Sequence, residues 1–176
     1  PTVRGMASEG NVYTGFLYAG LMIDKAGKPK VIEFNCRFGD PETQPIMVRL
    51  ESSLVLLVEA ALAKALDKVE ATWDPRPTVG VVLAAGGYPA DYAKGDVIEG
   101  LDAAAELDGK VFHAGTALNA AGEVVTAGGR VLCATAIGRT VEEAQQQAYR
   151  LAEKVRWNGR FYRNDIGYRA IAREQN

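Results

Sequence analysis

The sequence predicts an α+β fold divided into two units, and three observations lead to this fold class. Residues 16–23 and 31–35 are apolar runs on either side of a turn-rich segment, a pattern typical of an antiparallel hairpin with a long loop. Residues 74–77 contain two prolines and have the composition of a linker. After the linker, short apolar runs alternate with turns before one long amphipathic helix. We therefore assign residues 1–73 and 74–176 to separate units, the second a small mixed α/β unit.

The first unit should contain little regular structure before its hairpin and a helix near its end. Residues 1–15 are rich in glycine and polar side chains, so we expect a loop there. Ser52 or Ser53 can cap a helix that runs to about Leu66. Its apolar positions recur at intervals of three and four, which predicts one buried stripe made of Leu54, Leu57, Val58, Ala61, Leu62 and Ala65.

The second unit should be dominated by strands. The short apolar runs predict strands at residues 78–85, 111–114, 116–118, 124–126 and 130–137. Residues 119–122 have the composition of a hairpin turn. Thr140 and Glu143 form a capping box at the start of a helix over residues 140–156. Its predicted buried stripe consists of Val141, Ala144, Ala148, Leu151, Ala152 and Val155.

Composition and charge exclude several classes of function. The 176 residues carry 20 basic and 22 acidic side chains, a formal net charge of −2, with no basic block to neutralise nucleic-acid phosphates. No helical segment approaches the roughly 18 apolar residues that a membrane span needs. Cys36, Cys133 and His113 are too few and too scattered for a zinc site, so both thiols should be reduced and buried. We expect a cytoplasmic protein that binds neither nucleic acid nor membrane.

The beginning of the chain suggests a part of something longer. The first residue is Pro1, and the residues before Asn11 lack the basic stretch and apolar core of a signal peptide. A two-stranded hairpin is marginal alone, and these strands are too apolar to face water on both sides. We therefore expect a missing amino-terminal part of the same protein to supply more sheet.

Three polar residues at the end of the second predicted strand form the candidate site. Side chains alternate along a strand, so Glu33, Asn35 and Arg37 should share one face. Glu33 and Asn35 offer hard oxygen donors of the kind that Mg²⁺ prefers when a nucleotide supplies further ligands. Arg37 adds a planar cation able to hold a phosphate or carboxylate at two points. The alternative is an ordinary polar stripe on a solvated sheet face.

The residues that follow favour the site over the plain polar stripe. Asp40 is a good helix N-cap and Pro41 suits the first helical position, so a short helix is predicted over residues 41–48. Its N-terminus, which favours anions, would then lie near the metal pair and the guanidinium. Such a group of features is suited to phosphoryl transfer.

The twelve residues from Glu33 to Gln44, Glu-Phe-Asn-Cys-Arg-Phe-Gly-Asp-Pro-Glu-Thr-Gln, resemble the glycinamide ribonucleotide synthetases, an ATP-grasp family also called phosphoribosylamine–glycine ligases. The likeness extends along nearly the whole chain, through motifs at residues 13–15, 17–22, 86–89, 113–116, 128–132 and 162–167. It implies that residues 1–73 are the carboxy-terminal part of an ATP-grasp domain and that residues 74–176 are the family's carboxy-terminal domain.

The resemblance also implies a reaction and roles for residues. Glycine would be activated by ATP as glycyl phosphate and then joined to 5-phosphoribosylamine in purine biosynthesis. The family motif makes Glu33 and Asn35 ligands of Mg²⁺, or Mn²⁺, and Arg37 a catalytic residue. Gly39 and Asp40 would bind substrate, and the alternative for Asp40 is the role of a plain helix cap. His113 is a further candidate for substrate binding, with packing or a loop hydrogen bond as its alternative.

Two other functions remain open at the level of sequence. The chain could belong to another ATP-grasp carboxylate–amine ligase or carboxylase, or it could be a non-catalytic binding module. Many ATP-grasp enzymes carry a metal-binding acid on the strand before the Glu-x-Asn pair, whereas residues 17–23 contain none. The family's amino-terminal domain and adenine-binding half do not occur in the 176 residues, so the chain alone is expected to be inactive.

Overall fold

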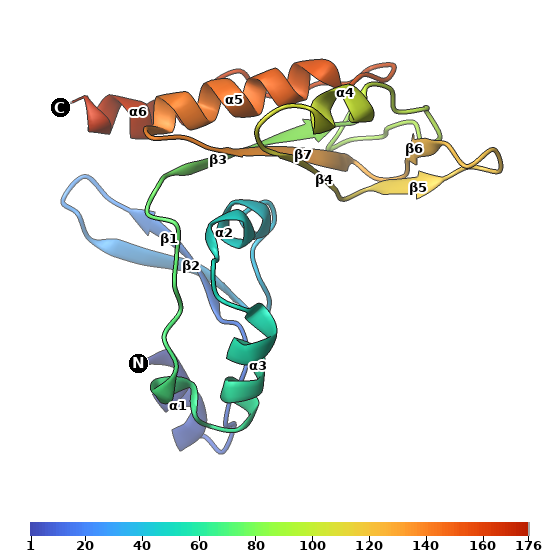
Figure 1. The fold of residues 1–176 in the computed structure, drawn as a ribbon. Helices are drawn as coiled ribbons and strands as arrows, with labels where there is room; N and C mark the ends of the chain where they lie inside the picture. Colours follow the sequence, from blue (N-terminus) through green and yellow to red (C-terminus); the bar gives the residue numbers. More distant parts are fainter. Residues whose placement is uncertain (176) are drawn as a thin grey trace. The chain divides into compact units, whose positions relative to one another are not determined.

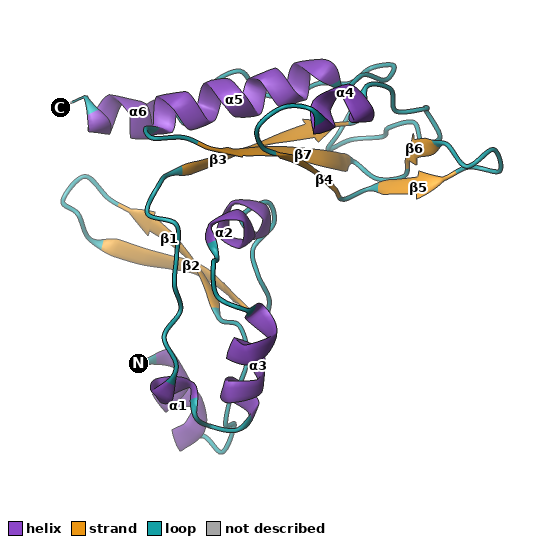
Figure 2. Ribbon diagram, in the orientation of Figure 1, coloured by secondary structure: helices purple, strands orange, loops and turns teal. Residues whose placement is uncertain are grey.

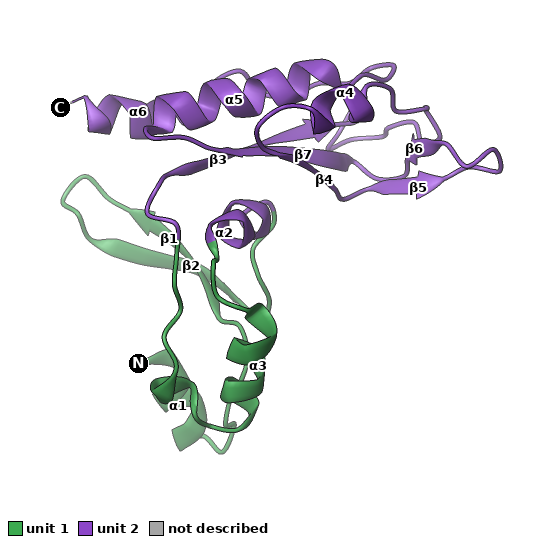
Figure 3. Ribbon diagram, in the orientation of Figure 1, with its two compact units in different colours: residues 1–40, 50–73 green, residues 41–49, 74–176 purple. Residues whose placement is uncertain are grey.

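The computed structural model describes residues 1–175, which form two compact units (Figure 3). The first unit comprises Pro1–Asp40 and Leu50–Trp73, and the second comprises Pro41–Arg49 and Asp74–Asn176. The mixed α/β composition with antiparallel sheets confirms the predicted fold class (Figure 2). Segment 41–49 lies in sequence between the two parts of the first unit but belongs to the second.

The first unit is built around an antiparallel hairpin of β1 (Tyr18–Ile23) and β2 (Pro29–Asn35) (Figure 1). Asp24 closes the connecting turn, since its carboxylate accepts hydrogen bonds from the backbone N–H groups of Ala26 and Lys28, both 2.9 Å long. The same unit contains α1 (Thr2–Ser8), α3 (Leu54–Leu62) and the 3₁₀ turn η1 (Leu66–Lys68).

Two expectations for the first unit are wrong. Residues 1–15 were expected to form a loop, but α1 occupies residues 2–8, because its Arg, Met and Ala side chains favour helix despite Gly5. The helix capped by Ser53 ends at Leu62 rather than near Leu66, because Lys64 adopts a left-handed conformation with φ of 56°.

No side chain of the first unit's described residues is fully buried, and Gly39 is the one residue there that is. The apolar stripe predicted for α3 is therefore only half-buried at its best, and Leu62 is 72% exposed. Large apolar side chains also remain exposed on both strands of the hairpin, including Met22, Ile23, Val31, Ile32 and Phe34. Among the described residues, the first unit therefore has no hydrophobic core of its own.

The second unit contains a three-stranded antiparallel sheet in the order β3-β7-β4, formed by Thr78–Ala84, Arg130–Ile137 and Lys110–His113. A small hairpin of β5 (Thr116–Leu118) and β6 (Val124–Thr126) follows the end of β4. Its turn is held by Asn119, whose carboxamide oxygen accepts from the N–H groups of Ala121 and Glu123. The five strands that the structure describes in this unit match the predicted positions to within one residue.

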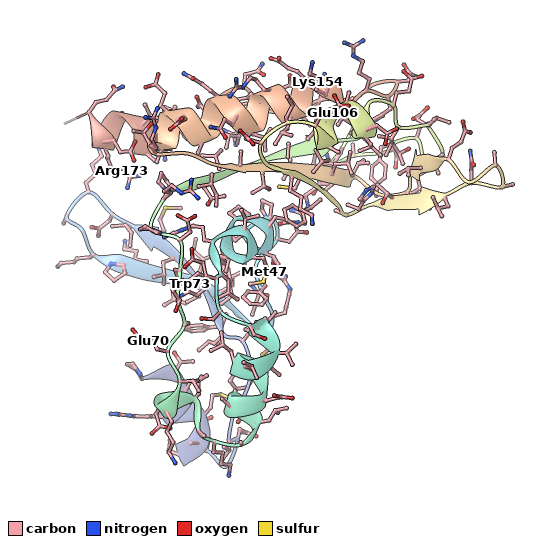
Figure 4. The ribbon with its side chains drawn as sticks, in the orientation of Figure 1. Met47, Glu70, Trp73, Glu106, Lys154 and Arg173 are labelled. Carbon is pink, nitrogen blue, oxygen red and sulfur yellow. The ribbon has the colours of Figure 1, made fainter. Side chains whose placement is uncertain are left out.

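The described residues of the second unit form four helices: α2 (Thr43–Arg49), α4 (Leu101–Ala105), α5 (Val141–Lys154) and α6 (Tyr168–Glu174). Helix α5 packs along β3 and β7, and its predicted apolar stripe lies in the core. Figure 4 marks the end of α5 at Lys154 and the last turn of α6 at Arg173. In residues 1–175, no helix is both long enough and apolar enough to span a bilayer.

Candidate functional site

The candidate metal ligands lie at the end of β2, on one face of the hairpin. Glu33 is directly opposite Gly20 and Asn35 is directly opposite Tyr18, so the four residues share a face. Glu33 is exposed and Asn35 is half-buried. The alternation of the strand therefore places both oxygen donors side by side along β2, as the sequence pattern predicts.

A β-bulge in β2 precedes Glu33 and Asn35, and it changes which other residues lie on the same face of the hairpin. Gly20 pairs with Glu33 but Leu21 pairs with Val31, so Ile32 is the extra residue of the bulge. Beyond the bulge, Met22 pairs with Lys30. Lys30 is therefore on the side of Glu33, where strict alternation would put Val31. Sequence reasoning missed Lys30, and the two consecutive β-branched residues at 31 and 32 give no signal of a bulge.

Glu33 and Asn35 suit a divalent cation whose remaining ligands are water and substrate oxygens. Among the described residues, no group of three or more His, Cys, Asp or Glu side chains gathers as a metal site. Glu33 and Asn35 supply two hard oxygen donors, and Mg²⁺ commonly keeps waters and substrate phosphates as its other ligands. The open space above Gly20 accommodates the Glu33 side chain, since a Cβ there would lie 3.0 Å from Glu33 Cγ.

Arg37 departs from the predicted arrangement. The strand ends at Asn35 and the chain bends at residues 36–37, so the alternation does not extend to Arg37. Its exposed guanidinium donates a hydrogen bond of 2.8 Å to the carbonyl oxygen of Phe38. The Phe38 ring packs on Phe16 with 4.1 Å between centroids, which anchors this bend.

The cysteine in the bend is exposed, contrary to the expectation that both thiols are buried. Neither Cys36 nor Cys133 forms a disulfide in the described part of the chain, and of the two only Cys133 is buried. The hydroxyl of Tyr13 donates to the carbonyl oxygen of Phe16, 2.6 Å away. Burial, followed by hydrogen bonding with the Cys36 thiol, raises the pKa of Tyr13.

The segment after the bend is a turn rather than the start of a helix. Gly39 is buried and Asp40 is exposed. Helix α2 begins at Thr43, three residues after Asp40, and the carbonyl oxygen of Glu42 accepts from the N–H of Ile46. The prediction of a helix starting at Pro41 is wrong, because Asp40, Pro41 and Glu42 form a turn first.

His113 belongs to the second unit, at the end of β4. Its Nδ1 lies 3.1 Å from Thr116 Oγ1, a hydrogen-bond distance, across the tight connection to β5. This contact is the loop hydrogen bond considered as the alternative to substrate binding. The other five candidate residues, Glu33, Asn35, Arg37, Gly39 and Asp40, all lie in the first unit.

Comparison with protein families gives two matches. Residues 78–169 match the model described as phosphoribosylglycinamide synthetase, C domain. Residues 1–43 match the model described as phosphoribosylglycinamide synthetase, ATP-grasp (A) domain. The first match covers more than half of the chain, and the second contains Glu33, Asn35, Arg37, Gly39 and Asp40.

Curated relatives and a solved structure carry the name phosphoribosylamine–glycine ligase. The protein of Pseudomonas aeruginosa is 88% identical over 175 residues, which is 99% of this chain and 41% of the relative. Those of Vibrio cholerae and Yersinia pestis are 70% and 68% identical over similar spans. A crystal structure from Thermotoga maritima superposes with a TM-score of 0.76 at 41% identity, covering 92% of this chain and 39% of that one. The chain spans about two fifths of the length of these relatives.

Proposed function

The chain belongs to the phosphoribosylglycinamide synthetase family, and we propose that it serves the ATP-dependent ligation of glycine to 5-phosphoribosylamine. A glycine carboxylate oxygen would attack the γ-phosphorus of ATP, and the bond to the β–γ bridging oxygen would break to release ADP. The amine of phosphoribosylamine would then attack the acyl carbon of glycyl phosphate. Phosphate leaves with the electron pair of the C–O bond, and the nitrogen gives up a proton as the amide forms.

The family's use of ATP and a divalent metal gives Glu33 and Asn35 their proposed roles. We assign the carboxylate of Glu33 and the carboxamide oxygen of Asn35 as ligands of Mg²⁺, which Mn²⁺ could replace. When bound, the metal neutralises charge on the phosphates of ATP and holds them in line for transfer. The two side chains share a face because they are two positions apart along β2, and this supports the assignment.

The exposed residues after β2 suit contacts with substrate. The Arg37 guanidinium has five N–H donors, of which one bonds to the Phe38 carbonyl, so it can also hold an acyl phosphate or the glycine carboxylate. We propose that Gly39 and Asp40 contact the substrate beside it. A role for His113 in binding substrate stays a prediction, as does a cytoplasmic location.

The division of labour along the chain is also a proposal. Residues 1–73 would be the later part of the ATP-grasp domain and residues 74–176 the carboxy-terminal domain. The exposed apolar side chains of the hairpin and the absence of a core in the described part of the first unit support an origin within a larger sheet. We therefore expect the 176-residue chain alone to be inactive as a ligase.

The observation that carries the proposal is the pair Glu33 and Asn35 on one face of β2, within the segment that matches the ATP-grasp domain. The test is an assay of the complete gene product that contains this chain for release of ADP from ATP. We expect release only when both glycine and 5-phosphoribosylamine are present. Release that does not depend on glycine would overturn the proposed reaction and favour another ATP-grasp ligase or a carboxylase. No release at all would favour a non-catalytic module.

Glu33→Ala provides the matching test of the metal site. We expect turnover to fall at least about 100-fold, the scale on which loss of one charge-stabilising contact acts in a transition state. The free energy of unfolding should change by no more than about 0.5 kcal/mol, since the side chain is exposed. Glu70→Ala, which removes another exposed carboxylate of the first unit, is the control (Figure 4). Near-normal turnover of Glu33→Ala at ordinary Mg²⁺ would refute the ligand assignment.

A further inference from the structure

We propose that Gly20 is a positioning residue for the metal site, because its lack of a side chain lets Glu33 extend over β1 with its carboxylate in place. This inference rests on the proposed function, since it takes Glu33 as a metal ligand. Gly20 acts only through Glu33 and would itself contact neither metal nor substrate.

The space above Gly20 is taken by Glu33. The two residues are directly opposite in the hairpin. A Cβ built on Gly20 would lie 3.0 Å from Glu33 Cγ and 3.7 Å from the backbone nitrogen and oxygen of the same residue. These are the three atoms nearest to that Cβ, so a methyl group at position 20 would first meet the side chain of Glu33.

The backbone of Gly20 does not itself require glycine. Gly20 lies within β1 beside the bulge and is not among the glycines with positive φ. A Cβ there would meet the main chain of β2 only at 3.7 Å, an ordinary contact distance, whereas a Cβ on Gly115 would lie 2.6 Å from Gly128 Cα. Glycine in a strand interior weakens the strand and often marks a close approach by another group. Here the group that approaches is the side chain of Glu33.

The β-bulge beside this pair adds a second constraint on where Glu33 points. Ile32 is the extra residue immediately before Glu33, and bulges re-aim neighbouring side chains. Gly20 on the opposite strand and the bulge in β2 therefore both affect the direction of the Glu33 side chain. Since Glu33 is long and flexible, a methyl group at position 20 should displace its carboxylate without breaking the strand pair.

Metal affinity is the property that Gly20→Ala should change. The probe is Mn²⁺ added with ADP to the complete gene product, with free Mn²⁺ followed by electron paramagnetic resonance. We expect the dissociation constant to rise on the order of 10-fold, the usual scale for residues that orient a metal ligand. The Mg²⁺ concentration for half-maximal rate should rise similarly, while kcat at saturating Mg²⁺ stays near the wild-type value. Unchanged Mn²⁺ affinity would overturn the inference.

Ala19→Val is the matched control. It adds a larger group to the adjacent position of the same strand, opposite Phe34 and on the other face of the hairpin. We expect it to leave Mn²⁺ affinity and the Mg²⁺ dependence unchanged. An equal loss of affinity in both variants would mean that β1 responds to any added bulk, and the specific role of Gly20 would be wrong.

Melting temperatures test the contact between Gly20 and the Glu33 side chain independently of the reaction. Glu33→Ala removes Cγ, so Gly20→Ala should lower the melting temperature less in that background than in the wild type. An equal shift in both backgrounds would contradict a contact through the Glu33 side chain. If the wild-type protein takes up no Mn²⁺ with ADP, the proposed function fails, and the thermal comparison still decides whether Gly20 holds Glu33.

Discussion

Asp74 is a buried charged residue, and its carboxylate is held by Arg76. Asp74 Oδ2 lies 2.6 Å from Arg76 Nη2, and Oδ1 also accepts from the backbone N–H of Arg76. Hydrogen bonds from the Arg76 side chain and then from its backbone N–H lower the pKa of Asp74 to about 2. Because the pKa is lower in the folded state than the value of about 3.9 in an unfolded chain, the charged form stabilises the fold.

The ion pair of Asp74 and Arg76 makes the stability of the fold depend on pH. The stabilisation is fully present above about pH 4 and is lost as the pH falls toward 2. We therefore expect the free energy of unfolding in urea to fall less between pH 5 and pH 2 in Asp74→Asn than in the wild type. Arg76→Gln should reduce the same dependence by removing the guanidinium. Identical acid sensitivity in all three proteins would contradict this role for the pair.

The sequence predicted part of the candidate site, and the strand geometry explains which part. Glu33 and Asn35 share a face because both lie inside β2, where alternation holds. Arg37 lies beyond the end of the strand, so the same rule does not apply to it. Lys30 joins the face through a bulge, which is set by the pairing of two strands and leaves no local mark in the sequence.

At the level of elements, the cap of α5 gives a sharp prediction. Thr140 Oγ1 accepts a hydrogen bond of 3.1 Å from the backbone N–H of Glu143. In return, the Glu143 carboxylate accepts a hydrogen bond of 2.7 Å from the backbone N–H of Arg139. Thr140→Ala should lower the free energy of unfolding by about 1 kcal/mol through loss of this cap. Thr140→Ser keeps the hydroxyl and should cost much less. Chemical denaturation measures both, and equal losses would rule out a capping contribution.

The helices show where local rules suffice and where they do not. Residue type and spacing predict Ser52 or Ser53 as one cap and Thr140 as another, and Ser53 and Thr140 accept the expected hydrogen bonds. Asp40 has an equally suitable side chain, yet the turn that follows it delays α2 until Thr43. Capping preference therefore marks a site where a helix can begin, whereas the path of the chain decides whether it does.

At the scale of the whole molecule, the sequence predicted the strands of the second unit well, but it did not predict that α2 packs with that unit. The apolar runs of β3 and β7 are buried and continuous, so their pattern is strong. Helix α2 lies in sequence between parts of the first unit, but Pro45 packs over Gly80 of β3, where a Cβ would lie 3.0 Å from Pro45 Cγ. This long-range contact has no signature in the local sequence.

The uneven distribution of the core leads to a final prediction about this chain. The buried apolar side chains of the described residues all lie in the second unit, among them Leu83 of β3, Leu132 of β7 and Leu151 of α5. The first unit's hairpin has hydrogen-bonded strands without buried side chains beneath them. Local stability depends on buried apolar contacts, so the amides of β1 and β2 should exchange with solvent far faster than those of β3 and β7.

Hydrogen exchange followed by mass spectrometry on the 176-residue chain measures this difference directly. Protection in β3 and β7 should approach that set by global unfolding, whereas β1 and β2 should exchange by local opening. Leu151→Ala, which removes a fully buried side chain of α5, should reduce protection of β3 and β7 but leave β1 and β2 nearly unchanged. Equal protection of the two sheets, or equal loss in the variant, would mean that the hairpin is stabilised together with the core of the second unit.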